Sequence, residues 1–329
     1  METTKDKVLA ALEQNKGTFL SGGSLAEELG ISRNSVWKTV RALESEGYSI
    51  ESVTGKGYML AADTSKLSAA SINHYLTASG IELEYHETID STNTRAKKRA
   101  GEGAPEGLLV VASEQTAGRG RQGRAFFSPK GSGIYFSLLL KPTLAFEHIP
   151  LITTFAAVCV AQTIDEVLEV NTQIKWVNDI FYEGHKAAGI LTEASLDAET
   201  AHVNSAVLGI GINVFEPEEG FPQDLGGIAH GISSATADTA DIRARLVAGI
   251  VNRFMAGYET IPAKTYLAEY RKRSLLDGRH VHIYVGSEDF MATVEGVDDD
   301  FRLHVKLDTG EERVLSSGEV HIPSSQLVS

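Results

Sequence analysis

The feature that most constrains the fold is a set of three short helical segments near the start of the chain, the last two of which are separated by a glycine. Apolar residues recur at helical spacing in residues 4–14, in Leu25–Leu29 and again in 32–47, with Gly30 between the last two. Serine is favoured immediately before a helix, so we expect Ser24 to cap the second helical segment and Ser32 to cap the third. Two strand-like runs at 48–53 and 58–60 follow around a glycine turn. The pattern predicts a winged helix-turn-helix.

The third of these helices has the composition of a DNA-recognition helix. Basic and amide side chains gather near its start, although residues 1–63 as a whole hold seven Lys or Arg against nine Asp or Glu. A winged module that contacts only protein remains the alternative. One module reads a short half-site, so DNA reading implies a homodimer on a two-fold-related operator. The candidate DNA-binding residues are Ser32, Arg33, Asn34, Ser35 and Lys38.

Charge and composition narrow the class of protein. A formal net charge of −14 over 329 residues argues against a general coat on nucleic acid or anionic membrane, so any DNA contact must be local. The single cysteine, Cys159, excludes an intrachain disulfide framework and suits a reducing compartment. The longest apolar run, Leu151–Ile164, is short and threonine-containing for a membrane span, and the first residues lack a secretory signal. We expect a cytoplasmic protein without a membrane partner.

The middle of the chain alternates strand and helix patterns, which predicts a mixed α+β domain with a sheet built partly from hairpins. The expected strands are Leu83–Glu87, Leu108–Ser113, Gly133–Leu140, Gln173–Trp176, Ile180–Tyr182, Gly189–Ala194 and Ala206–Asn213, and the expected helices are Ser68–Ser79, Thr92–Gly101, Pro150–Val170 and Asp241–Thr260.

The last fifty residues change to a period of two, after one more helix at Tyr266–Arg273. Apolar and polar residues alternate from His280, and four or five short strands with turns between them predict a small all-β barrel. Three consecutive acids, Asp298–Asp300, are more typical of a turn than of a metal site, because no further spaced ligands accompany them.

A glycine–arginine loop follows the strand-like run at 108–112. In residues 113–124 three glycines alternate with three arginines. Glycine lets backbone N–H groups approach a ligand, and the arginine fork suits phosphate or carboxylate. The loop therefore predicts an anion site that closes over its ligand, with a solvated basic loop or a nucleic-acid patch as the alternatives.

Four further motifs accompany Gly118–Arg121 in order: Asp90–Asn93, Lys175–Asp179, Lys186–Leu191 and Gly209–Asn213. Together, behind a helix-turn-helix, they resemble the bifunctional biotin protein ligases that are also biotin operon repressors. The resemblance covers essentially the whole chain. It implies a multidomain α+β protein: a winged helix-turn-helix at 1–64, a mixed α/β ligase core of class II synthetase type at 65–276, and a small SH3-like β-barrel at 277–329.

The resemblance also implies a two-step reaction. Biotin and ATP with Mg²⁺ give biotinyl-5′-AMP, whose biotinyl group passes to one lysine of a biotin carboxyl carrier protein. Biotinyl-5′-AMP is also the corepressor, which promotes a homodimer on the operator DNA of biotin genes. Lys186 and Arg121 carry the catalytic role, and Asp179 is the candidate on the Mg²⁺ side. The biotin and adenylate set is Ser91, Thr92, Asn93, Gln115, Gly118, Arg119, Gly120, Arg121, Lys186, Gly189 and Gly209, and the nucleotide set is Arg124, Trp176, Asn178 and Asn213.

The sequence departs from the family pattern at three positions. Val177 stands where the family often has proline, Gln122 where it often has a basic residue, and Phe126 where it often has tryptophan. None of these removes a group that the reaction needs. Two other functions stay open at this point: a ligand-sensing repressor with a catalytically impaired core, and a ligase for lipoate or another acid.

Overall fold

The computed structural model describes residues 3–143, 145–196, 203–223, 225, 227–233 and 241–322. The chain divides into two compact units. Unit 1 comprises Met1–Thr77 with Ser234–Val251, and unit 2 comprises Ala78–Ser233 with Asn252–Ser329. The domain boundaries expected at residues 64 and 276 stay predictions.

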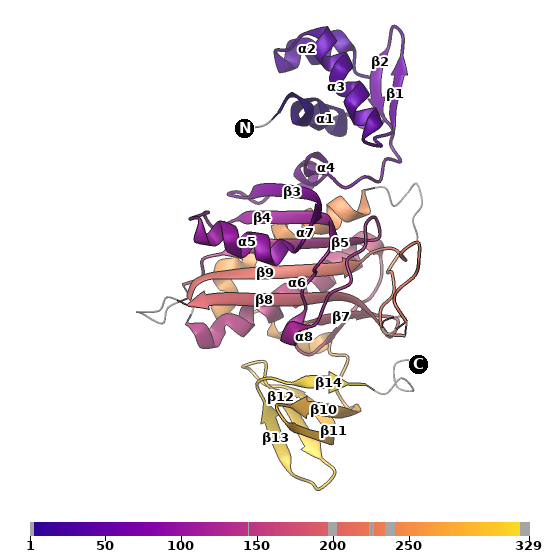
Figure 1. Ribbon diagram of the computed structural model, residues 1–329. Coiled ribbons are helices and arrows are strands. Elements are labelled where there is room, and N and C mark those ends of the chain that lie inside the picture. The colour runs from indigo at the N-terminus through magenta and orange to yellow at the C-terminus, as the bar shows by residue number, and fades with distance from the viewer. Residues whose placement is uncertain are drawn as a thin grey trace. The chain divides into compact units, whose positions relative to one another are not determined.

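Unit 1 contains the expected winged helix-turn-helix (Figure 1). Its helices bury Val8, Leu12, Leu25, Val40 and Leu43 in one core, as the helical spacing requires. Two antiparallel strands form the wing, with Ile50 opposite Leu60. The elements are α1 (Thr4–Gln14), α2 (Gly22–Leu29), α3 (Arg33–Ser45), β1 (Ile50–Val53), β2 (Gly57–Leu60), α4 (Ala69–Tyr75) and the first part of α7 (Ile242–Gly257).

The caps of these helices confirm one expectation and correct another. Ser32 caps α3, and its hydroxyl accepts a hydrogen bond from the Ser35 backbone N–H. The expectation that Ser24 caps α2 is wrong. The cap is Ser21, whose hydroxyl accepts from the backbone N–H of Ser24, so the helix begins three residues earlier, at Gly22. Gly30 ends the helix in the left-handed conformation that glycine favours.

Unit 2 is built on a seven-stranded sheet in the order β3-β4-β5-β9-β8-β7-β6. Among the described residues only β3 and β4 pair in parallel, and the other neighbours are antiparallel. The expected mixed sheet with hairpins is therefore confirmed. Its strands are β3 (Glu82–Ile89), β4 (Leu108–Gln115), β5 (Gly133–Leu140), β6 (Gln173–Lys175), β7 (Asp179–Tyr182), β8 (His185–Leu196) and β9 (Val203–Asn213).

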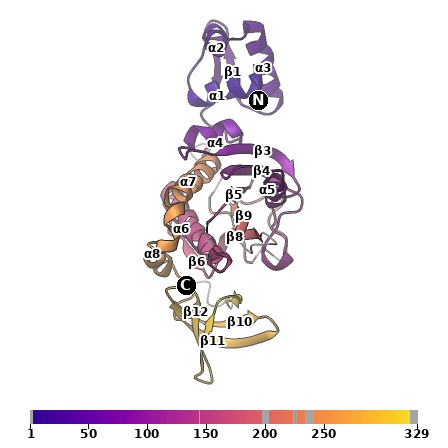
Figure 2. The ribbon, with the colours of Figure 1, turned by 90° about the vertical axis from the view of Figure 1, so that its left-hand side faces the viewer.

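Helices cover both faces of this sheet (Figures 1 and 2). Helix α5 (Thr92–Gly101) lies on one face against β4, β5 and β9, and α6 (Ile149–Leu168) lies on the other against β6, β7 and β8. Helix α8 (Leu267–Lys272) packs on α6. The described residues also contain the short 3₁₀ helices η1 (Arg121–Gly123), η2 (Phe146–His148) and η4 (Tyr258–Ala263).

Helix α6 corrects one argument from the sequence. The apolar run Leu151–Ile164 is short for a membrane span, but the helix that contains it has 20 residues. By length and composition alone, that helix is long enough to cross a membrane. Most of it is buried inside the protein, as the core helix of a globular domain is. Cys159 lies on its buried part, where burial raises the pKa of the thiol to about 12.

The C-terminal part of unit 2 is the expected small all-β domain. Five antiparallel strands pair in the order β13-β12-β11-β10-β14 and bury Val281, Ile283, Val294 and Val305. The strands are β10 (His280–Val285), β11 (Glu288–Val297), β12 (Leu303–Leu307), β13 (Glu312–Leu315) and β14 (Glu319–His321). The acids Asp298–Asp300 occupy the turn between β11 and β12, as predicted.

Candidate active site

A cavity of about 630 Å³ lies in unit 2, within the size range of small-molecule sites. Strands β8 and β9, the glycine–arginine loop, the segment between β6 and β7 and strand β14 all contribute to its wall. The structure brings together every ligand-site residue predicted from the sequence except Gly118 at this cavity. Those residues are Ser91, Thr92, Asn93, Gln115, Arg119, Gly120, Arg121, Arg124, Trp176, Asn178, Asp179, Lys186, Gly189, Gly209 and Asn213.

One end of the cavity is lined by neutral polar groups. Gln115, at the end of β4, accepts hydrogen bonds from the backbone N–H and the hydroxyl of Thr92, at 2.9 and 3.1 Å. Ser137 of β5 contacts the Thr92 hydroxyl and the Asn93 carbonyl oxygen, at 2.8 and 2.6 Å. Ser91 caps α5 and fixes where these residues lie. The arrangement presents donors and acceptors without net charge, which suits an uncharged polar ligand group.

Glu193 of β8 does not line the cavity but contacts two residues that do, Asn93 and Arg119, and no sequence motif indicated it. It accepts hydrogen bonds from Asn93 at 2.8 Å and Lys97 at 2.5 Å, and it lies 3.4 Å from Arg119. Burial alone would raise the pKa of its carboxyl, but the bonds from Asn93 and Lys97 outweigh burial and hold the pKa below its usual value. Period two along β8 places it on the same face as Gly189, a signal that was present in the sequence.

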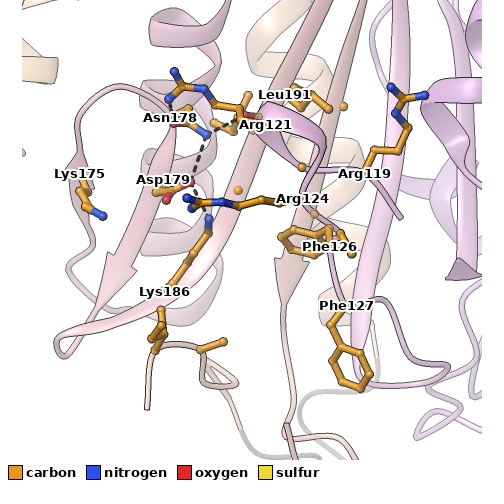
Figure 3. Close-up of a pocket in the computed structure, with 18 of the residues that line it drawn as sticks. Arg119, Arg121, Arg124, Phe126, Phe127, Lys175, Asn178, Asp179, Lys186 and Leu191 are labelled. Carbon is orange, nitrogen blue, oxygen red and sulfur yellow. Dashed lines mark hydrogen bonds and ion pairs between the residues drawn. The ribbon is translucent and has the colours of Figure 1, made fainter. Parts of the chain in front are cut away.

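The other end of the cavity carries a chain of charged contacts, drawn in Figure 3. Arg121 donates to the Asn178 side-chain oxygen at 2.8 Å, and Asn178 donates in turn to Asp179 at 3.1 Å. Asp179 pairs with the Lys186 ammonium at 2.7 Å. Lys186 is 27 % exposed, so its charge is accessible from the cavity. A second ammonium, that of Lys175, lines the same wall, and burial lowers its pKa.

Backbone and side-chain bonds hold the segment that carries Lys186. Its N–H donates to the Ile228 carbonyl at 2.6 Å, and its own carbonyl accepts from the Asn213 side chain at 3.1 Å. Asn213 ends β9, beside β8 in the sheet. The predicted nucleotide residue Asn213 therefore supports the start of β8, which carries Lys186, as well as lining the cavity.

The three arginines of the glycine–arginine loop each contact a different wall. Arg119 pairs with Glu193 of β8, Arg121 with Asn178 before β7, and Arg124 with Glu319 of β14. The Arg119 and Arg124 side chains are still 51 % and 67 % exposed. Exposed ion pairs contribute little stability, so a more highly charged ligand can displace these partners.

At several glycines near the site, neighbouring groups of the protein occupy the space that a Cβ would need. A Cβ at Gly209 would lie 2.1 Å from the Asn93 oxygen, and one at Gly211 would lie 2.4 Å from the Phe126 ring. A Cβ at Gly118 would lie 2.4 Å from the Phe126 carbonyl oxygen. Gly189 and Gly209 belong to the predicted biotin and adenylate set. In the structure their free space is filled by Asn93 above Gly209, and by Phe126 with Lys186 above Gly189.

Trp176 forms part of the wall but is only 6 % exposed. Its indole N–H donates to the Phe301 carbonyl at 2.8 Å, a contact with the C-terminal sheet that no local sequence pattern indicated. The Trp176–Val177 peptide bond is cis. Strand β14, with Glu319, also lines the cavity without having been predicted, because this contact joins positions far apart in the chain.

The candidate DNA-binding residues lie together in unit 1, at the start of α3. The Ser32 and Ser35 hydroxyls contact each other at 2.9 Å within the cap. Arg33, Asn34 and Lys38 are exposed on this helix, and beside them Trp37, a large apolar side chain, is 48 % exposed. Exposed polar and aromatic side chains at the start of a second helix are the arrangement by which such modules enter a DNA groove.

Comparison with known proteins bears on the whole chain. Residues 4–59 match the HTH domain, residues 85–213 the biotin/lipoate A/B protein ligase family, and residues 278–322 the biotin protein ligase C-terminal domain. The bifunctional ligase/repressor BirA of Bacillus subtilis is 37 % identical over 326 residues, which cover 96 % of this chain and 98 % of the relative. The chain belongs to the bifunctional biotin ligase and repressor family.

Other members of the family support the same assignment. The bifunctional ligase/repressor BirA of Escherichia coli is 29 % identical over 97 % of both chains. A solved biotin protein ligase from Aquifex aeolicus, in complex with biotin and ATP, superposes with a TM-score of 0.59 at 24 % identity. The match covers 73 % of this chain and 97 % of the Aquifex aeolicus chain. At 24 % identity this likeness shows the fold alone. The predicted fold class, family and ligase activity are thereby confirmed.

Proposed function

We propose that this biotin ligase with a helix-turn-helix repressor domain uses the cavity in unit 2 to make biotinyl-5′-AMP. It then transfers the biotinyl group to one lysine of a biotin carboxyl carrier protein. The observation that carries the proposal is the convergence of a neutral polar end and a cationic end in one cavity, with Lys186 and Arg121 joined through Asn178 and Asp179. Such a cavity fits a ligand with an uncharged head and an anionic tail.

The neutral end would hold the biotin ring system. Its ureido group carries donors and an acceptor without charge, and Thr92, Asn93 and Gln115 offer matching groups fixed by the hydrogen bonds from Ser137 and to Glu193. Gly209 allows Asn93 this position. Holding the ring fixes the direction in which the biotin carboxylate points, toward the cationic end.

At the cationic end a biotin carboxylate oxygen attacks the α-phosphorus of ATP, and the bond to the bridging oxygen breaks to release pyrophosphate. Two anions must meet, so positive charge at both is the main requirement. Lys186 is proposed to bridge the carboxylate and the α-phosphate, exchanging its pairing with Asp179 for the reacting oxygens. Arg121 is proposed to neutralise the adenylate phosphate, while Arg124, Trp176, Asn178 and Asn213 are proposed to hold the nucleotide.

The donor set fits Mg²⁺ that arrives with ATP. In the described residues no cluster of three or more His, Cys, Asp or Glu offers a metal cage. Mg²⁺ in nucleotide sites is commonly held by one or two carboxylates and the phosphates, and it neutralises phosphate charge. Asp179, which lines the cavity beside Lys186, is the residue proposed to contact it.

In the second step the carrier lysine amine attacks the acyl carbon, the bond to the phosphate oxygen breaks, and AMP and a proton leave. The loop of residues 113–124 is proposed to cover the adenylate until then. Arg119, Gly118 and Gly120 would contribute its cationic and backbone donors, and enclosure would exclude water from the mixed anhydride.

Repression is proposed to use the same intermediate. Ordering of the loop by biotinyl-5′-AMP would favour a homodimer, and two copies of α3, through Ser32, Arg33, Asn34, Ser35 and Lys38, would then match the operator of biotin genes. The coupling between adenylate and operator would be about 1–3 kcal/mol, as is usual for linked sites. Cytoplasmic operation follows from these partners and fits the buried, single thiol.

Two assays test the proposed function. The chain should label a purified biotin carboxyl carrier domain with biotin only when ATP and Mg²⁺ are present, and biotin should outcompete lipoate. Operator binding should tighten about 5- to 150-fold when biotin and ATP are added together. Failure to label the carrier would refute the ligase, and unchanged operator affinity would refute the switch.

A further inference from the structure

The turn between β11 and β12 is held in a defined shape by hydrogen bonds within it. We call residues 298–302 the Phe301 turn. Asp298 accepts hydrogen bonds from the backbone N–H groups of Asp300 and Arg302, at 2.8 and 2.9 Å, and from the Arg302 side chain. Phe301 then adopts φ +58°, in the left-handed region that a bulky residue rarely enters. Such a conformation persists only where the surroundings hold it.

What holds Phe301 is the ligase core. The side chain is only 4 % exposed, stacks on the Tyr266 ring at 5.1 Å, and meets the Tyr270 ring edge-on at 5.2 Å. Tyr266 precedes α8 and Tyr270 lies within it, so the tip of a C-terminal hairpin is inserted beside a helix of the core. Aromatic pairs of this geometry contribute beyond their buried area.

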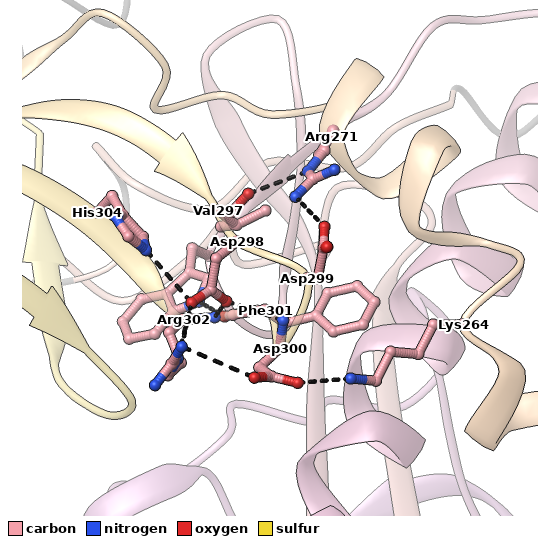
Figure 4. Close-up of polar contacts among 10 residues, drawn as sticks. Lys264, Arg271, Val297, Asp298, Asp299, Asp300, Phe301, Arg302 and His304 are labelled. Carbon is pink, nitrogen blue, oxygen red and sulfur yellow. Dashed lines mark hydrogen bonds and ion pairs between the residues drawn. The ribbon is translucent and has the colours of Figure 1, made fainter.

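Charged contacts surround the inserted ring, as Figure 4 shows. Asp300 pairs with Lys264 at 2.6 Å, and Asp299 pairs with Arg271 at 2.9 Å. Arg271 also donates to the Val297 carbonyl at 3.0 Å. The Asp299 side chain is 86 % exposed, so its ion pair lies at the periphery and contributes little. The aromatic contact is the centre of this junction.

The inserted turn touches the segment that carries the cationic end of the cavity. The Phe301 carbonyl accepts the Trp176 indole N–H at 2.8 Å, and the Tyr270 hydroxyl donates to the Val177 carbonyl at 3.2 Å. The next two residues are Asn178 and Asp179, the partners of Arg121 and Lys186. The junction thus fixes two consecutive residues immediately before the two that hold the reacting cations.

We propose that Phe301 is a positioning residue for adenylate formation: its turn holds Trp176–Asp179 so that Asn178 and Asp179 present Arg121 and Lys186 to the reacting oxygens. This role rests on the proposed function. It gives the C-terminal sheet a part in the first chemical step, through a residue that does not itself line the cavity. Among the described residues, no hydrogen bond or ring contact joins Phe301 to the neutral end on α5, β4 and β5.

If Phe301 has this role, substituting it should lower the rate of biotinyl-5′-AMP formation and leave biotin binding unchanged. Phe301→Ala in the full-length chain should lower the rate constant of biotinyl-5′-AMP formation by about 10- to 100-fold, the range that follows a displacement of catalytic groups by roughly 1 Å. The Kd for biotin alone and the number of biotin sites per chain should change less than about twofold. Phe301→Leu, which fills the space but removes the ring stacking, should lose roughly three- to tenfold.

The chain offers a matched control and a local reporter. Asp299→Ala removes a peripheral ion pair of the same turn and should leave the rate within about twofold. The sequence holds two tryptophans, Trp37 and Trp176, so in a Trp37→Phe background the fluorescence reports Trp176 alone. Phe301→Ala should shift that emission to longer wavelength, because without the aromatic ring the turn no longer holds its carbonyl against the Trp176 indole, which then gains water.

The measurement is the single-turnover release of pyrophosphate, with biotin titration on the same samples. A rate unchanged in Phe301→Leu and Phe301→Ala, or a loss matched by an equal fall in the number of biotin sites, would overturn the role of Phe301. If Phe301→Ala does not fold, Phe301→Leu decides alone. A parent chain that releases no pyrophosphate would overturn the proposed function and this role together, whereas an active parent with equally active variants overturns only the role.

Discussion

Gly209→Ala tests how tightly the sheet holds the neutral end of the cavity. A Cβ at this position would lie 2.1 Å from the Asn93 side-chain oxygen and 2.8 Å from its Cγ, closer than atoms pack. Asn93 cannot move aside freely, because Ser137 donates to its oxygen at 2.6 Å and it donates to the Glu193 carboxylate at 2.8 Å. The substitution must therefore break contacts.

The size of the effect follows from those two bonds. A neutral hydrogen bond contributes about 1 kcal/mol and one to a charged group about 1.5–3 kcal/mol, so displacing Asn93 should lower the free energy of unfolding by roughly 2.5–4 kcal/mol. That is a large part of the roughly 5–15 kcal/mol of a whole domain. The affinity for biotin should fall with it, because Asn93 is displaced from the neutral end.

Urea unfolding followed by circular dichroism, together with biotin titration, measures both quantities. Gly101→Ala is the matched control: a Cβ there meets nothing within 4 Å, and its position at the end of α5 should gain up to about 1 kcal/mol from the helix propensity of alanine. An unfolding midpoint and a biotin affinity for Gly209→Ala equal to those of the parent would refute the reasoning.

Three further substitutions probe separate groups. Lys186→Ala should slow biotinyl-5′-AMP formation by about 10²–10³, as expected for losing one electrostatic stabiliser, measured by pyrophosphate release; a normal rate would exclude its bridging role. Arg121→Gly should let biotinyl-5′-AMP escape and label bystander lysines, seen by mass spectrometry; full retention would contradict its contact with the phosphate. Burial raises the pKa of Glu13 from 4.5 to about 7, so the native chain binds this proton more tightly and stability falls as pH rises between those values. Glu13→Gln should flatten that fall in urea unfolding at pH 5 and 8, and an identical slope would count against the buried carboxyl.

Local signals in the sequence were sufficient for the elements and for most of the cavity lining. Helical spacing, a serine before α3 and Gly30 after α2 each act within a few residues, and the structure contains those features. The run Ser21-Gly22-Gly23-Ser24 has a serine at each end, and the position of the first helical turn makes Ser21 the cap instead of the predicted Ser24. Local chemistry alone could not make that choice.

Contacts between distant parts of the chain were not predictable in this way. Glu193 contacts Asn93 of α5 across 100 residues, and Phe301 contacts Trp176 across 125. Neither lies in a motif. Period two along β8 indicates the sheet face of Glu193, but not its partners. The contacts of both residues depend on how strands are ordered in a sheet and on which hairpin packs against which helix, and period and composition do not give that order.

The central claim is that the cavity in unit 2 forms biotinyl-5′-AMP and keeps it. The most direct measurement incubates the full-length chain with biotin, ATP and Mg²⁺ but without a carrier protein, then separates protein from small molecules. We predict one pyrophosphate released per chain and one biotinyl-5′-AMP retained with it. No pyrophosphate, or an adenylate that does not travel with the protein, would contradict the claim.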